Sequence, residues 1–200
     1  MGHDPKGIDG VYGPNTARAL AASLAEVGGN SAQDLFDHSG LHSIVWHWTA
    51  GARGINYVET RSYNGLVDVE GNIYDGQFRP EAQATYAVGR AASHTLNANT
   101  HRAGLAMDCM AGAVEYPLTW GLNPMTEIQV EKTLYQTAIW VKRFGIKVSK
   151  YTVLSHAEVQ PTLNIKQNNK WDITCLPGMN AVEDAVKIGD MLRERLKDYL

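Results

Sequence analysis

Three short apolar segments, at residues 43–48, 103–109 and 151–155, are the features that most constrain how this chain can fold. Each has the length of a β-strand, and polar or turn-forming residues follow each of them. Residues 63–69 and 72–75 add a predicted hairpin that turns at Glu70-Gly71. The chain therefore offers several short strands for one sheet, separated by longer connections.

Helical patterns lie between and after these strands. A long helix is expected to begin at Thr126, where Gln129 completes a capping box, and to end near Gly145. Its apolar stripe consists of Val130, Leu134, Ala138 and Val141. A last helix is expected to begin at Asn180, with Glu183 at the capping-box position and with inward-facing Val182, Val186, Leu192 and Leu196.

Strands mixed with packing helices predict an α/β fold, with a single mixed β-sheet and helices packed on its faces. With 200 residues and 44% hydrophobic content, the chain suits one globular core. The net charge of -3 gives no basic field for nucleic acid, and no apolar run is long enough to span a bilayer. Two cysteines, Cys109 and Cys175, provide no disulfide framework.

Two histidines occupy special places in this strand pattern. His47 comes at the end of an apolar run, just before a turn at Gly51, and His156 directly follows the segment 151–155. Asp172 lies a short distance further along the chain. Two imidazoles and one carboxylate form the ligand set of a catalytic zinc site with one open position. The two histidines can meet only if their strands are neighbours, so the hypothesis predicts that adjacency and places the site at strand ends in an open groove.

The sequence resembles the zinc-dependent N-acetylmuramoyl-L-alanine amidases, the family shared by phage lysozymes, cell-wall recycling enzymes and peptidoglycan-recognition proteins. The hairpin at residues 62–74 and the stretch at residues 93–104 are similar to intermediate segments of that family. The resemblance covers about residues 43–178, with the segments in the family's order. Its three metal-site segments are Val45-Trp46-His47-Trp48-Thr49-Ala50-Gly51, Ser155-His156-Ala157-Glu158-Val159-Gln160-Pro161 and Lys170-Trp171-Asp172.

The resemblance implies a role for each matching residue. The implied zinc ligands are His47, His156 and Asp172. Lys170 would stabilise the oxyanion of the tetrahedral intermediate. Tyr63 would hydrogen-bond or relay a proton near the metal, unless it only covers the sheet. His94 would contact substrate or orient the scissile carbonyl, unless it is an ordinary loop histidine.

Two departures from the family pattern leave alternatives open. Several recycling members carry a glutamate general base at a strand position that falls on Ala106 here, and Asp108 lies two residues further on. The identity of the general base is therefore open. The family's third ligand stands before Pro-Gly, which makes Cys175 an alternative to Asp172, although the Lys170 spacing favours Asp172. Glu158 is expected to be an acceptor that fixes the local structure.

The surroundings of the proposed ligands give further expectations. Trp46 and Trp48 point opposite to His47 along the strand, so they belong in the core. The polar segment 160–169 is expected to form either a rim loop of the cleft or a surface loop without substrate contact.

The N-terminal residues 1–30 are expected to be separate from a zinc amidase catalytic domain at residues 31–200. Residues 9–20 resemble the closing part of a peptidoglycan-binding repeat and lead into a predicted helix at residues 16–27, ending at Gly28-Gly29. That segment is either a structural cap or a cell-wall anchor. Residues 1–6 lack the apolar core of a secretory signal, so we expect synthesis in the cytoplasm and action on the cell wall after release by another factor.

The resemblance predicts a monomeric hydrolase that cleaves the amide bond between N-acetylmuramic acid and L-alanine of peptidoglycan, with Zn²⁺ as cofactor. A phage or prophage endolysin is the favoured setting. A recycling amidase, a secreted effector amidase and a non-catalytic peptidoglycan-recognition module are alternatives. The last alternative is an unrelated α/β protein whose histidines are structural.

Overall fold

The computed structural model describes residues 17–22 and 40–200. Residues 17–22 are helical, within the helix expected at residues 16–27. The rest of the N-terminal segment, including most of the peptidoglycan-binding-like motif, lies outside the described residues. No helix in the described part of the chain is long and apolar enough to cross a membrane.

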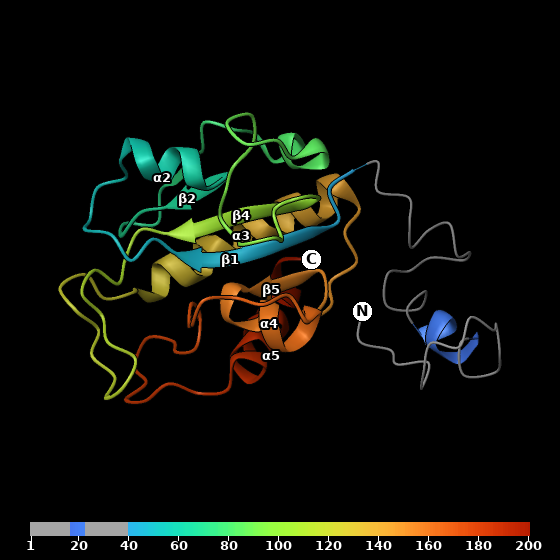
Figure 1. The fold of residues 1–200 in the computed structure, drawn as a ribbon. Helices are drawn as coiled ribbons and strands as arrows, with labels where there is room; N and C mark the ends of the chain where they lie inside the picture. Colours follow the sequence, from blue (N-terminus) through green and yellow to red (C-terminus); the bar gives the residue numbers. More distant parts are fainter. Residues whose placement is uncertain (1–16, 23–39) are drawn as a thin grey trace.

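One mixed sheet organises the described chain, and it confirms the predicted fold class (Figure 1). The strand order is β3-β2-β4-β1-β5. Three pairings, β2 with β4, β4 with β1 and β1 with β5, are parallel, and the β2–β3 hairpin is antiparallel. The strands are β1 (Ser43–Trp48), β2 (Gly65–Val67), β3 (Ile73–Asp75), β4 (Arg102–Met107) and β5 (Val153–Ser155).

Helices cover both faces of this sheet (Figure 1). The long helix α3 runs behind β1 and β4 and contacts α5, whereas α4 contacts β1 and β5 from the other side. Short helices follow β1 and the β2–β3 hairpin. The helices are α2 (Tyr57–Ser62), η2 (Pro80–Thr85), α3 (Glu127–Phe144), α4 (His156–Leu163), α5 (Ala185–Leu196) and η3 (Lys197–Tyr199).

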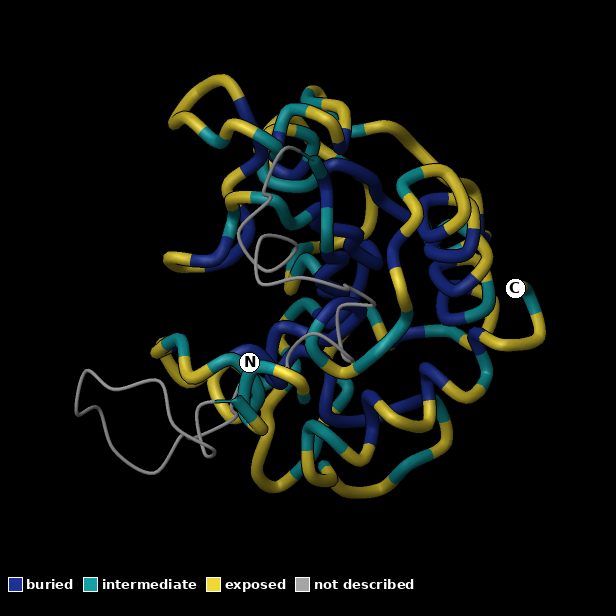
Figure 2. The backbone as a smooth tube through the Cα atoms, turned by 90° about the vertical axis from the view of Figure 1, so that its right-hand side faces the viewer, coloured by how far each residue is buried: buried dark blue, intermediate teal, exposed yellow. Residues whose placement is uncertain are grey.

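All residues of strand β1 are buried, and buried segments gather in the interior of the molecule (Figure 2). Side chains alternate between the faces of a strand. Trp46 and Trp48 belong to the main core with α3 and α5, as expected, and the indole of Trp46 donates to Thr137 of α3 at 2.8 Å. Val45 packs on the opposite face with Val159 of α4. His47 has the same parity as Val45, so its imidazole lies on the α4 side of the sheet.

The predicted boundaries of the long helix are confirmed, whereas the predicted start of the last helix is wrong. Thr126 and Gln129 form the capping box of α3, and Gly145 is its C-cap. Helix α5 begins only at Ala185, with Asp184 as N-cap. The backbone N–H of Glu183 donates to the carbonyl of Thr174 at 2.8 Å, so a tertiary contact holds the residues before α5 in a loop.

Other boundaries also differ from expectation. Strand β5 begins at Val153 and not at residue 151, because Thr152 closes a turn on Ser149 through backbone and hydroxyl hydrogen bonds. Strand β2 covers Gly65–Val67 and not residues 63–69, and β4 covers Arg102–Met107 and not residues 103–109. The segment 160–169 is not a loop throughout, since α4 continues to Leu163, and Gln167 of its remaining residues contacts His156.

Replacing Thr126 with alanine is expected to destabilise the fold by about 1 kcal/mol, because the first turn of α3 loses the acceptor for the Gln129 N–H. Urea unfolding measures this loss. The Thr126→Ser variant keeps the hydroxyl and serves as the control, so equal losses in both variants would contradict the capping role.

Candidate metal centre

The sheet brings His47, His156 and Asp172 together. His47 lies near the end of β1, and His156 is the first residue of α4, directly after β5. Since β1 and β5 are parallel neighbours, the adjacency that the sequence hypothesis required is confirmed. One ligand atom from each of the three side chains lies within 4.8 Å of the other two, and all three residues are buried, so the group could hold a metal ion.

Asp172 stands between the two imidazoles. Its Oδ2 atom lies 3.0 Å from Nδ1 of His47 and 3.2 Å from Nδ1 of His156. Two adjacent ligands of a tetrahedral zinc ion, at the usual bond lengths, are separated by about 3.3 Å. Oδ2 of Asp172 therefore already lies at nearly this spacing from Nδ1 of each imidazole.

His94 supports His47 at its Nε2 atom. The Nε2 atom of His94 lies 3.0 Å from the carbonyl oxygen of Arg102, which can only accept, so this nitrogen is the donor. Burial, followed by the charge of His47, holds the pKa of His94 well below its usual range, so its Nδ1 atom is an acceptor. That atom lies 2.8 Å from the hydroxyl of Thr95 and 3.1 Å from Nε2 of His47, either of which can donate to it.

The imidazole of His47 is neutral at pH 7. Burial lowers its pKa to about 4, and the charges of His156 and Lys170 add to this effect against the opposing influence of Asp172. Its Nδ1 atom lies 3.0 Å from Oδ2 of Asp172, where it can donate to the carboxylate or, without that proton, bind a metal ion. A neutral ring is the form in which histidine binds a metal.

Gln167 determines which nitrogen of His156 carries a proton. The amide nitrogen of Gln167 donates to the carbonyl oxygens of Leu96, at 2.9 Å, and Ile165, at 3.3 Å. Both partners are acceptors, so the Gln167 oxygen must be the atom that faces His156 Nε2, at 3.0 Å. His156 then donates from Nε2 and, when neutral, presents the lone pair of Nδ1 to Asp172.

The three groups thus converge on one point. Burial acts to raise the pKa of Asp172, but hydrogen bonds and charges of His156 and His47 outweigh burial and lower the pKa to about 2, so the carboxylate is anionic. Two imidazole lone pairs and a carboxylate oxygen repel one another at these distances unless a cation or protons lie between them. This donor set fits a divalent metal ion, and in particular one that accepts nitrogen and oxygen ligands.

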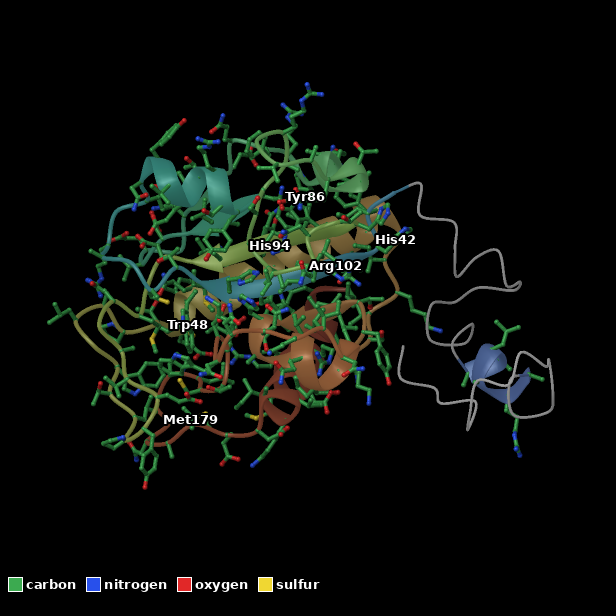
Figure 3. All side chains as sticks on the ribbon, viewed as in Figure 1. His42, Trp48, Tyr86, His94, Arg102 and Met179 are labelled. Atoms are coloured by element: carbon green, nitrogen blue, oxygen red, sulfur yellow. The ribbon has the colours of Figure 1, made fainter. Side chains whose placement is uncertain are left out.

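His94 itself lies behind His47 and not at an open surface. It is only 8% exposed, and Thr95 also contacts its Nδ1 atom, at 2.8 Å. Its ring lies over β4 at Gly104, where a Cβ atom would come within 2.6–3.0 Å of the imidazole (Figure 3). This placement favours a supporting role toward His47 in place of the substrate contact expected from the sequence.

Tyr63 and Lys170, the two expected catalytic residues, also lie near the three groups. The rings of Tyr63 and His47 have centroids 5.2 Å apart. Burial, followed by the charges of Asp172 and Glu59, raises the pKa of Tyr63, so its hydroxyl stays protonated. Lys170 is exposed, and its charge reaches His47, whose pKa it helps to lower.

The two departures noted in the sequence have structural answers. Asp172, and not Cys175, joins the two histidines, since Cys175 is buried in the main hydrophobic core. Ala106 pairs with His47 in the sheet, so β4 brings no carboxylate to that position. Asp108 lies beyond it and accepts from the backbone N–H of Gly54 at 2.7 Å. The expected open groove stays a prediction.

Three neighbours of the centre were missed in the sequence. Gln167 comes from the segment after α4, and Thr95 follows His94 in the loop before β4; neither has a sequence signature. Glu59 is a buried carboxylate whose charge raises the pKa of Tyr63 and whose own pKa is raised by burial and by the charge of Asp108. Its signal was available, because Asn56 and Glu59 form the capping box of α2.

Comparisons with family models, with curated proteins and with solved structures gave no match to this chain. The resemblance to the zinc amidases therefore rests on the residues and segments of the sequence, and the geometry of the centre stands independently of it.

Replacing Asp172 with asparagine is expected to abolish tight binding of zinc, because the only anionic member of the group is lost. Isothermal titration and metal analysis of purified protein measure this effect. Asp108→Asn is the matched control, since Asp108 is also a buried carboxylate beside the end of β1 but lies outside the group. Equal zinc binding by wild type and Asp172→Asn would contradict the assignment.

Without metal, the protein is expected to lose stability as the pH falls from about 6.5 to 4. His47 in the unfolded chain takes up a proton near pH 6.5, whereas the folded protein does so only near pH 4, so protonation favours unfolding in this window. The shift corresponds to about 3 kcal/mol. Urea unfolding in EDTA at several pH values measures the slope. The His47→Gln variant should show a shallower slope, and an unchanged slope would contradict this origin.

Proposed function

We propose that this chain is a zinc-dependent N-acetylmuramoyl-L-alanine amidase, which cleaves the amide bond between N-acetylmuramic acid and L-alanine of peptidoglycan. The observation that carries the proposal is the convergence of two imidazole Nδ1 atoms on one carboxylate oxygen, at separations of 3.0 and 3.2 Å from that oxygen. Three protein ligands are the number that catalytic zinc sites use, since they leave a position for water or substrate.

His47, His156 and Asp172 would hold the zinc ion, with His94 and Gln167 supporting the two histidines. When bound, zinc would polarise the scissile carbonyl and activate water. The Tyr63 hydroxyl, protonated at neutral pH, can donate a hydrogen bond to an oxygen beside His47.

Lys170 supplies a positive charge on the exposed side of the group, where negative charge develops on the carbonyl oxygen during amide hydrolysis. The sequence segments that resemble the amidases supply the choice of bond and of substrate. They also support zinc over other divalent ions. Peptidoglycan is the proposed partner, the cell wall the proposed place of action, and an endolysin the proposed setting.

Digestion of purified peptidoglycan, followed by mass spectrometry, tests the proposal. The wild-type protein with zinc is expected to release free stem peptides from intact glycan strands, and EDTA should stop the release. Lys170→Met is expected to lower kcat by about 10²-fold or more, because the developing oxyanion loses its charged partner. Tyr63→Phe should reduce kcat by a similar factor while zinc binding is retained.

Reducing sugar ends in the digest would indicate a glycosidase and contradict the proposal. Binding to peptidoglycan without any release of peptides would instead indicate a recognition module on the same fold.

A further inference from the structure

A buried carboxylate lies directly behind the metal centre. Glu158, in the first turn of α4, is completely buried. Its Oε2 atom accepts from the backbone N–H of Ser155 at 2.7 Å, and its Oε1 atom accepts from the guanidinium of Arg193 at 2.8 Å. The capping contact confirms the local fixing role expected for Glu158. The partner on the other side comes from a different helix, α5.

Arg193 distributes its donors over the end of β5 and the helices next to it. Besides Glu158, it donates to the carbonyl of Val153 in β5 at 2.9 Å and to the carboxylate of Asp190 at 2.7 Å. Its side chain is only 8% exposed, and that of Glu158 is fully buried. The guanidinium thus joins α5 to β5, which precedes His156, and to α4, which begins with His156.

Helix α5 has a glycine, Gly189, at the point where it approaches Glu158. A Cβ atom at Gly189 would lie 2.1–2.2 Å from the carboxylate atoms of Glu158. Only a residue without a side chain allows α5 to approach the carboxylate this closely, so the backbone of α5 confines Glu158 from one side while Arg193 binds it from another.

The first turn of α4 positions two of the three proposed ligands. Ser155, which Glu158 caps, immediately precedes His156. The backbone N–H of Ala157 donates to the carbonyl of Asp172 at 2.6 Å, so the same turn also holds the backbone of Asp172. A shift of this turn would therefore move His156 and Asp172 relative to His47, which belongs to β1.

We propose that Arg193, with Glu158 and Gly189, is a positioning device for the metal centre: α5 holds the first turn of α4 in the register at which His156 and Asp172 meet His47 around one ion. This inference deepens the proposed function and rests on its metal site. Arg193 does not contact the ligands themselves, and it acts on metal affinity through the position of the turn.

A buried ion pair by itself is a weak argument for stability, because desolvation of the charges offsets their attraction. Arg193 also contacts Asp190 of its own helix, but outside α5 the contacts of this pair are concentrated on Val153 and Ser155, which lie just before His156 in the chain. A role in fixing geometry explains this concentration, whereas a general contribution to stability would not require it.

Zinc affinity of the folded protein tests the proposal, measured by competition with a chelating dye. Arg193→Met is expected to weaken zinc binding by about 10- to 100-fold, the usual effect of removing a group that orients metal ligands. Arg195→Met is the matched control, because Arg195 lies on the same helix but pairs with Glu127 and Glu131 of α3, and its zinc affinity should equal that of wild type.

Two further variants separate positioning from folding. Gly189→Ala keeps both charges but displaces the Glu158 carboxylate, so it should also weaken zinc binding. This variant tests the proposal if Arg193→Met does not fold. Arg193→Lys keeps one charge and should recover part of the affinity. The visible spectrum of the cobalt-loaded variants reports the coordination geometry, and we expect it to differ from wild type in Arg193→Met and Gly189→Ala alone.

Wild-type zinc affinity in folded Arg193→Met and Gly189→Ala, with only the melting temperature lowered, would overturn the positioning role and leave the proposed function intact. Absence of zinc binding by the wild-type protein would overturn both. Tight zinc binding by wild type, loss of it in these two variants and no cleavage of peptidoglycan would support the positioning role and contradict the amidase.

Discussion

The parallel pairing of β1 with β5 is the constraint on which the metal centre depends. It sets His47, near the end of one strand, beside His156, which directly follows the other. Both strands are buried, so the register is fixed by the core on both faces of the sheet. Asp172 then needs only to reach this one place, and its backbone is held there by Ala157 of α4.

Each histidine is held from a different direction. The loop before β4 supplies His94 for His47, and the segment after α4 supplies Gln167 for His156. In both cases a carbonyl oxygen further out holds the supporting side chain, because a carbonyl can only accept. The two chains of hydrogen bonds end at Nδ1 atoms beside the same carboxylate oxygen. A cation at that point can bind both nitrogens and the carboxylate at once.

The fold class and the identity of the three groups could be predicted from the sequence, because strand-length apolar segments mark where His47 and His156 emerge. The contacts that orient them could not. His94 was expected at the site, but its contact with His47 has no signal in the sequence. Nothing local distinguishes Gln167 from other polar loop residues. The start of α5 was misplaced for a similar reason, since the hydrogen bond from Glu183 to Thr174 overrides a local capping pattern.

The position of His47 also shows why a ligand is expected here. An imidazole within a fully buried strand replaces an apolar side chain that would pack at no electrostatic cost. Burial keeps the ring neutral, whereas the contacts of Asp172 with the two histidines keep its carboxylate anionic against the effect of burial, so the folded chain encloses a negative charge. Such local conflicts between a residue and its surroundings occur where a binding site requires them. A divalent ion would remove the conflict, and its binding energy would then contribute to the stability of the fold.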